Sequence, residues 1–126
     1  MKSYRQFLVL EDDPQLRGVI VSFLGQFLPE WGSIYVAHPG QAKQHIHENL
    51  SIGLLVAGLE LQGYEETGLD VIRWVREYRR DVACILTTGG GGIVLSSVPE
   101  GVPVLLQPFT GAQLIVAVRE SWGNLS

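Results

Sequence analysis

The sequence contains a single cysteine, so an internal disulfide is excluded. Cys84 lies within the apolar stretch VACILTT, which favours a buried thiol in a reducing compartment. Basic residues are also few: nine Lys and Arg against thirteen Asp and Glu give a net charge of −4. The chain therefore lacks the positive charge that direct binding to a nucleic-acid backbone requires.

Long hydrophobic runs are missing as well. No stretch approaches the roughly 20 apolar residues of a membrane helix. The first residues, MKSYRQFLVLEDD, reach acidic side chains where a signal peptide would remain apolar. We therefore expect a cytoplasmic protein without a membrane partner. Its 126 residues, of which 46% are hydrophobic, are enough for one domain, which we expect to span residues 1–126.

What the sequence does contain is a regular alternation of two patterns. Short apolar runs such as QFLVL predict strands that are buried on both faces, and the stretches between them carry apolar residues at helical spacing. Strands are predicted at 6–10, 33–37, 52–58, 83–88 and 102–106. Helices are predicted from Pro14 to just before Pro29, over 41–49, around 69–76, around 93–97 and over 110–122. This order predicts a doubly wound α/β fold, in which helices cover both faces of a parallel sheet.

The functional edge of such a sheet can also be predicted. Ligands of doubly wound proteins bind outside the carboxyl ends of the parallel strands. This rule selects the polar residues and the glycine that directly follow or end the predicted strands. They are Glu11, Asp12 and Asp13 after the first strand, Gly58 at the end of the third, Thr87 and Thr88 at the end of the fourth, and Gln107 after the fifth.

Four segments, LVLEDDPQLR, LELQGYEETGLDVIRWVR, ILTTGG and LLQPF, occur in this order across almost the whole chain. Together they resemble the CheY-like receiver domain of two-component response regulators. The resemblance implies a flavodoxin-like sheet with strand order 2-1-3-4-5 and a role in signal transduction or a phosphorelay. It also implies a reaction centre: an acidic pair that binds Mg²⁺, an aspartate that accepts a phosphoryl group, a hydroxyl that contacts the phosphate, and a lysine before Pro-Phe.

Only part of that centre is present. Glu11 and Asp12 match the acidic pair, and Thr87 matches the hydroxyl. Gly58 stands where the family has the phosphoacceptor aspartate, and Gln107 stands where it has the lysine. Glycine has no nucleophile and glutamine has no charge. The chain therefore resembles an atypical pseudo-receiver, for which we expect no catalysis of its own and no cofactor beyond weakly bound Mg²⁺.

Several alternatives remain open from the sequence. In the first alternative, the third predicted strand continues past Gly58, and Glu60 takes the place of the acceptor aspartate. The chain would then accept a phosphoryl group on an unconventional residue. In the second alternative, the acidic pocket that lacks the acceptor aspartate binds a small molecule, and the domain is a small-molecule sensor. For residues 11–13, the alternative to a vestigial metal site is a solvated strand end followed by a helix N-cap. For Thr87, the alternative is a hydrogen bond to nearby backbone.

The resemblance also implies an interaction surface. In receivers, the fourth helix, the fifth strand and the last helix form the face on which these domains dimerise or meet partners. Ile93, Val94 and Leu95 would lie there, together with Val104, which replaces an aromatic residue that often reports activation. We expect self-association through this face or a protein partner such as a histidine kinase, an output domain or another regulator.

Three further predictions concern local structure. The family resemblance implies a cis peptide bond at Gln107-Pro108. The run REYRRD, residues 76–81, is predicted to form the solvent-facing side of its helix. The three histidines, at positions 38, 45 and 47, lack the spacing of metal ligands and are expected on the surface.

Overall fold

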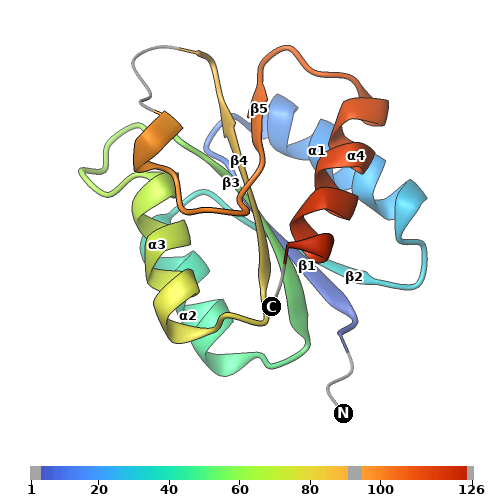
Figure 1. The fold of residues 1–126 in the computed structure, drawn as a ribbon, viewed down its shortest axis with the longest axis horizontal. Coiled ribbons are helices and arrows are strands. Elements are labelled where there is room, and N and C mark those ends of the chain that lie inside the picture. Colours follow the sequence, from blue (N-terminus) through green and yellow to red (C-terminus); the bar gives the residue numbers. More distant parts are fainter. Residues whose placement is uncertain (1–3, 91–94, 125–126) are drawn as a thin grey trace.

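The computed structural model describes residues 4–90 and 95–124, and it shows the predicted alternation of strands and helices (Figure 1). The strands are β1 (Gln6–Leu10), β2 (Gly32–Val36), β3 (Ile52–Gly58), β4 (Ala83–Thr88) and β5 (Val104–Leu106). The helices are α1 (Pro14–Phe27), α2 (Pro39–Glu48), α3 (Gly68–Tyr78), the short 3₁₀ helix η1 (Leu95–Ser97) and α4 (Gly111–Gly123). Within these described residues, no helix combines the length and apolar character needed to cross a bilayer.

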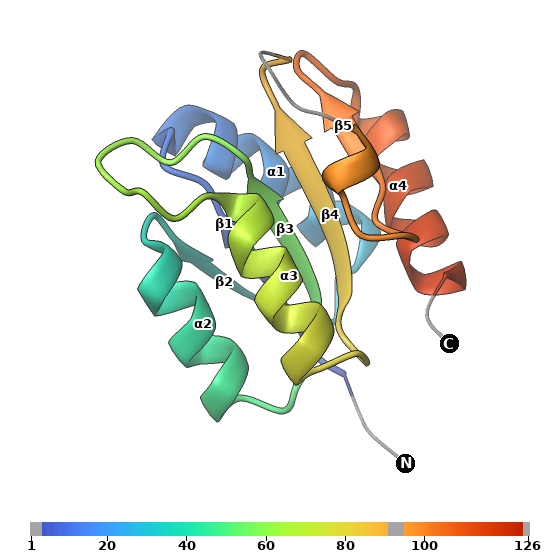
Figure 2. The same cartoon turned by 60° about the vertical axis from the view of Figure 1, so that its left-hand side comes forward.

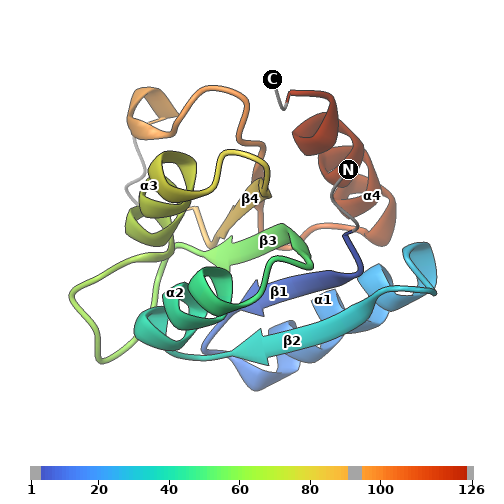
Figure 3. The same ribbon diagram turned by 90° about the horizontal axis from the view of Figure 1, so that it is seen from below.

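All five strands are parallel and lie in the order β2-β1-β3-β4-β5, as predicted. Helices α2 and α3 cover one face of the sheet, and α1 and α4 cover the other (Figures 2 and 3). The carboxyl ends of the strands therefore meet at one edge. In the register there, Leu10 is paired with Ala57, and Gly58 with Thr87.

The core explains why β1, β3 and β4 are almost continuously apolar. Successive side chains of a strand point to opposite faces of the sheet, and both faces are covered by helices. Leu8 and Leu55 pack under α2 and α3, whereas Val9 and Val56 pack under α1 and α4. Cys84 is buried in the same sheet, as predicted, and burial raises the pKa of its thiol to about 12.

The predicted fourth helix is the main difference. The described part of 93–97 is not an α-helix but the three-residue turn η1, and positions 93 and 94 lie outside the described residues. Glycines occupy 89–92 and Pro99 follows closely, so few residues remain in which to nucleate an α-helix. The other boundaries agree with prediction to within about two residues, and the Gln107-Pro108 bond is cis, as predicted.

Candidate functional site

Most of the polar residues selected from the sequence, though not Thr87 and Thr88, line a depression at the carboxyl edge of the sheet. Its volume is about 180 Å³. The lining residues come from the ends of β1, β3, β4 and β5 and from the start of α1: Glu11, Asp12, Asp13, Leu16, Glu60, Gln62, Gly89 and Gln107. Among the described residues, the lining contains four carboxylates and no cationic side chain.

The last of the three acidic residues, Asp13, is the N-cap of α1. Its Oδ1 accepts hydrogen bonds from the backbone N–H groups of Gln15 (2.9 Å) and Leu16 (3.5 Å). Pro14 is the first helical residue, a position where its missing N–H costs nothing. The capping interpretation is confirmed for this residue, which is exposed.

Glu11 is different, because only 4% of it is exposed. Its Oε2 accepts a hydrogen bond from the backbone N–H of Asp13 (3.2 Å). Burial, followed by a hydrogen bond with the Asp12 carboxylate, raises the pKa of Glu11 to about 7. The interpretation of Glu11 as part of a solvated strand end is therefore wrong.

The pKa of the neighbouring Asp12 carboxyl group is shifted in the opposite direction, below its usual value. Burial acts to raise the pKa of Asp12, but hydrogen bonds from the backbone N–H of Gln62 and from the Glu11 side chain together lower it. The Gln62 bond measures 2.9 Å. The two neighbouring carboxyl groups therefore have pKa values shifted in opposite directions, upward at Glu11 and downward at Asp12.

Gly58 ends β3 directly beside the Glu11 side chain. A Cβ atom built on Gly58 would lie 2.5 Å from Oε1 of Glu11, closer than real Cβ atoms come to other atoms, and 3.2 Å from its Cδ. The Glu11 carboxyl group therefore occupies the space into which a side chain at position 58 would extend. Gly58 is thus matched to the inward conformation of Glu11.

The two threonines that end β4 have different environments. Thr87, which pairs with Gly58, is fully buried, and its Oγ1 has no hydrogen-bond partner in the part of the chain that the structure describes. The expectation of a backbone hydrogen bond for Thr87 is wrong. Thr88 Oγ1 instead donates to Oε1 of Glu60 (2.8 Å), which also accepts from the backbone N–H of Gly89 (3.2 Å).

These contacts decide the position of Glu60. Strand β3 ends at Gly58, so it does not continue to Glu60 as the alternative required. The Glu60 carboxylate is bound to the end of β4. Gln107 lies across the depression, where its backbone N–H donates to the Thr88 carbonyl (2.9 Å) and its side chain is uncharged.

The residues as placed do not fit a Mg²⁺ ion. This cation prefers octahedral oxygen ligands. Glu11 is turned toward Gly58, and Asp12 accepts a backbone hydrogen bond. Across residues 4–90 and 95–124, no three His, Cys, Asp or Glu side chains are grouped so that they could hold a metal ion.

His38 and His47 are exposed, as expected, and contact Tyr64 and Tyr78.

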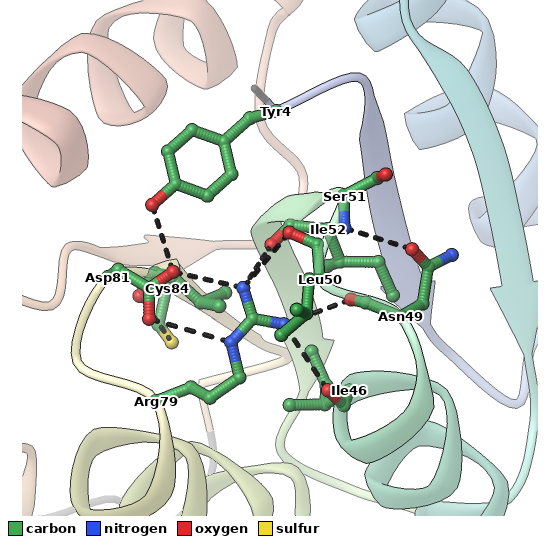
Figure 4. Close-up of polar contacts among 10 residues, drawn as sticks. Tyr4, Ile46, Asn49, Leu50, Ser51, Ile52, Arg79, Asp81 and Cys84 are labelled. Carbon is green, nitrogen blue, oxygen red and sulfur yellow. Dashed lines mark hydrogen bonds and ion pairs between the residues drawn. The ribbon is translucent and has the colours of Figure 1, made fainter. Parts of the chain in front are cut away.

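A second polar cluster lies at the opposite end of the sheet, around Arg79 (Figure 4). The prediction that 76–81 faces solvent is wrong for this residue, because only 6% of it is exposed. Its Nη2 forms an ion pair with Asp81 at 3.0 Å. The guanidinium also donates to four backbone carbonyls, those of Ile46 (3.2 Å), Asn49 (2.9 Å), Leu50 (3.4 Å) and Ile52 (3.1 Å).

The sequence held a signal for this burial. The apolar face of α3 contains Leu69, Ile72 and Val75, and Arg79 follows Val75 by four residues, so it falls on the same face. Because Arg79 lies within the charged run 76–81, this helical periodicity was not used in the sequence prediction. Tyr4 adds to the cluster by donating its hydroxyl to Asp81 (2.9 Å).

An apolar groove follows the open edge of the sheet. It has a volume of about 330 Å³ and is lined by β5 and α4 residues and their neighbours, Pro103, Val104, Leu105, Ala112, Gln113, Val116, Ala117 and Glu120. Leu106 and Val116 are 59% and 51% exposed, whereas Val104 is half-buried. Ile93 and Val94 of the predicted surface lie outside the described residues, and of Leu95 only the backbone is described.

Comparisons with solved structures give the same fold. A response regulator receiver protein from Sinorhizobium medicae is 21% identical, with a TM-score of 0.82 and 98% of each chain covered. The receiver domain of NtrX from Brucella abortus is 18% identical, with a TM-score of 0.80, 94% of this chain and 98% of that one covered. A CheY-like receiver domain protein from Methanospirillum hungatei is 17% identical, with a TM-score of 0.77 and coverage of 98% and 97%.

Sequence comparisons give no match, either with protein-family models or with curated proteins. At identities of 17 to 21%, the structural likeness establishes a shared fold and leaves the chemistry to the residues themselves. The chain has the fold of a response regulator receiver domain.

Proposed function

We propose that this chain is an atypical receiver module of two-component signalling that acts through protein–protein contacts and accepts no phosphoryl group. The observation that carries the proposal is Gly58 at the end of β3, with the Glu11 carboxyl group filling the space of its missing side chain. Phosphoryl transfer to a protein requires a nucleophilic side chain, and glycine has none.

The surroundings support the same conclusion. Phosphoryl transfer is accelerated by cations that stabilise charge on the transferring group. The depression has four carboxylates in its lining, and Gln107 supplies no charge. Glu60, the one alternative acceptor considered, already accepts two hydrogen bonds at the end of β4.

The direct test is incubation with acetyl phosphate and Mg²⁺ followed by intact-mass spectrometry. We expect the mass of the protein to stay unchanged, because no carboxylate lies at position 58 and the described residues that line the depression include no cationic side chain. Glu60→Gln is the matched variant. A phosphoryl adduct on the natural protein would contradict the proposal, and loss of that adduct in Glu60→Gln would identify Glu60 as the acceptor.

The contact surface in this proposal is the groove along β5 and α4. Its exposed apolar residue is Val116, beside the half-buried Val104, and the exposed Leu106 follows the groove residue Leu105 at the end of β5. Placing a carboxylate in an apolar contact costs several kcal/mol, so Leu106→Asp and Val116→Asp should each abolish the interaction. The measurement combines sedimentation, for self-association, with quantitative co-purification from the native cell.

The control for this surface is Val19→Asp on α1. Val19 has a similar exposure, 46%, but lies outside the groove. It should leave both readouts unchanged. If Leu106→Asp and Val116→Asp behave like Val19→Asp while circular dichroism shows an intact fold, this groove is not the contact surface.

A further inference from the structure

We propose that β2 is a self-pairing edge, through which two copies of this chain join their sheets by antiparallel pairing of their Gly32–Val36 strands. β2 is the outermost strand on its side of the sheet (Figure 3). It lies at the opposite end of the strand order from β5, so this contact is separate from the groove along β5 and α4. The pairing places self-association at β2, leaves that groove to a different protein, and does not depend on whether the chain accepts a phosphoryl group.

The first argument is the direction of the backbone groups of β2. The Gly32 N–H donates to the Arg5 carbonyl (2.6 Å), so Gly32 faces β1. Successive residues of a strand direct their N–H and C=O groups to opposite sides. Ser33 and Tyr35 therefore direct theirs away from β1, to a side where the described residues include no further strand. Such outward groups are a template for pairing with another strand.

The sequence of β2 also lacks the features that usually block an edge strand. These features are charged residues, proline and bulges. β2 reads GSIYV, and its register with β1 is continuous from Gly32 to Val36. The side chains of Ser33 and Tyr35 are both exposed, Tyr35 to 59%. The strand is therefore open to a partner strand.

A second copy fits this edge because the edge is complementary to itself. In an antiparallel pair, two opposite residues exchange both of their backbone hydrogen bonds when the groups of both point across the gap. With a two-fold axis at Ile34, Ser33 lies opposite Tyr35 of the second copy. The axis repeats this pair, since a two-fold contact uses the same residues on both sides. All outward N–H and C=O groups of Ser33 and Tyr35 are then paired in both copies.

The charges near the two ends of β2 favour the same arrangement. The exposed Glu30 precedes the strand. The Arg17 guanidinium lies over the ring of Tyr35, near the other end, at 5.9 Å from the ring centroid. Antiparallel pairing brings the start of one strand beside the end of the other. Glu30 of each copy therefore lies toward Arg17 of the other copy, whereas parallel pairing would bring like charges together.

The helix beside this edge leaves room for a second copy. A groove of about 300 Å³ lies between α1 and Tyr35, and Gly18 and Val21 contribute to its lining. A Cβ atom on Gly18 would have no neighbour within 4 Å, although glycine is unfavourable within a helix. The described part of the chain therefore does not itself require glycine at this position. The missing side chain keeps the groove open next to the pairing edge.

The test is sedimentation equilibrium of the natural protein, Ser33→Pro and Ser33→Ala. We expect the natural protein to be a dimer that dissociates on dilution. Proline at position 33 removes an outward N–H and leaves the bonds to β1 in place. Half of the bonds between the copies are then lost, so the dissociation constant should rise at least about tenfold. Ser33→Ala keeps the N–H and should match the natural protein.

Two results would overturn the inference. One is a natural protein that is monomeric at every concentration, even if its edge binds a strand of another protein. The other is a folded Ser33→Pro that dimerises as tightly as the natural protein.

Leu106→Asp separates this contact from the groove at the other edge. It should leave the dimer intact, so that co-purification of a different protein is the readout that it lowers. If Leu106→Asp dissociates the dimer and Ser33→Pro does not, self-association belongs to the groove and the inference is wrong. Circular dichroism checks each fold. If Ser33→Pro does not fold, Tyr35→Lys replaces it, because a lysine on an edge strand opposes pairing. A folded Tyr35→Lys that dimerises like the natural protein would equally contradict the inference.

Discussion

Arg79→Ala is expected to lower the free energy of unfolding by about 3 to 5 kcal/mol, the cost typical of breaking a buried ionic network by removing one partner. The guanidinium is buried and donates to carbonyls of α2, of the segment that follows it and of the first residue of β3. Without it, carbonyls at the end of α2 lose their partner, and the Asp81 carboxylate loses its ion pair with Arg79. Each unpaired buried group costs about 1 to 3 kcal/mol.

Two variants control this experiment. Arg80→Ala changes the neighbouring exposed arginine and should stay within about 0.5 kcal/mol of the natural protein. Arg79→Lys keeps the charge but loses the planar fork that reaches several carbonyls, so an intermediate loss is expected. Urea unfolding followed by far-UV circular dichroism measures all three. Similar midpoints for Arg79→Ala and Arg80→Ala would show that the network adds little stability.

The fold could be predicted from the sequence because its signals are local and repeated. The apolar runs at 6–10, 52–58 and 83–88 are each buried on both faces, and helical periodicity separates them. The strand-end rule then brought Glu11, Asp12 and Gln107 to one edge, where the structure has them. The prediction of a fourth helix was wrong because helix propensity over five residues is a weak signal beside a glycine run and a proline.

The site could be predicted only in its composition. That position 58 lacks a nucleophile is visible in the sequence, but the direction of the Glu11 side chain depends on the space left by a residue in another strand. Packing between strands likewise leaves the Thr87 hydroxyl without a hydrogen-bond partner among the described residues. It also sets the hydrogen bond from the Thr88 hydroxyl to Glu60. Sequence patterns report which side chains share an edge, and tertiary packing decides where each one points.

Gly68→Ala is expected to lower the free energy of unfolding by about 3 kcal/mol or more, at or beyond the upper end of usual overpacking costs. A Cβ atom on Gly68 would lie 2.7 Å from the carbonyl carbon of Gly58 and closer still to its oxygen. Both atoms are backbone, so no side chain can rotate away. Either α3 or the end of β3 must move.

Movement of α3 is costly because its first turn is fixed twice. Thr67 and Asp70 form a capping box, in which Thr67 Oγ1 accepts from the Asp70 N–H (3.1 Å) and Asp70 Oδ2 accepts from the Thr67 N–H (2.9 Å). The Gly68 N–H also donates to the Leu59 carbonyl (3.2 Å). The strain is therefore expected to reach the strand end that carries Gly58.

The matched control for this substitution is Gly25→Ala in α1. A Cβ atom there has no neighbour within 4 Å, and alanine is favoured over glycine in a helix. Gly25→Ala should therefore stabilise the domain by about 0.4 to 1 kcal/mol. Urea unfolding of both variants decides the matter. If Gly68→Ala is as stable as the natural protein, α3 does not press on the Gly58 carbonyl, and the end of β3 has more room than this structure shows.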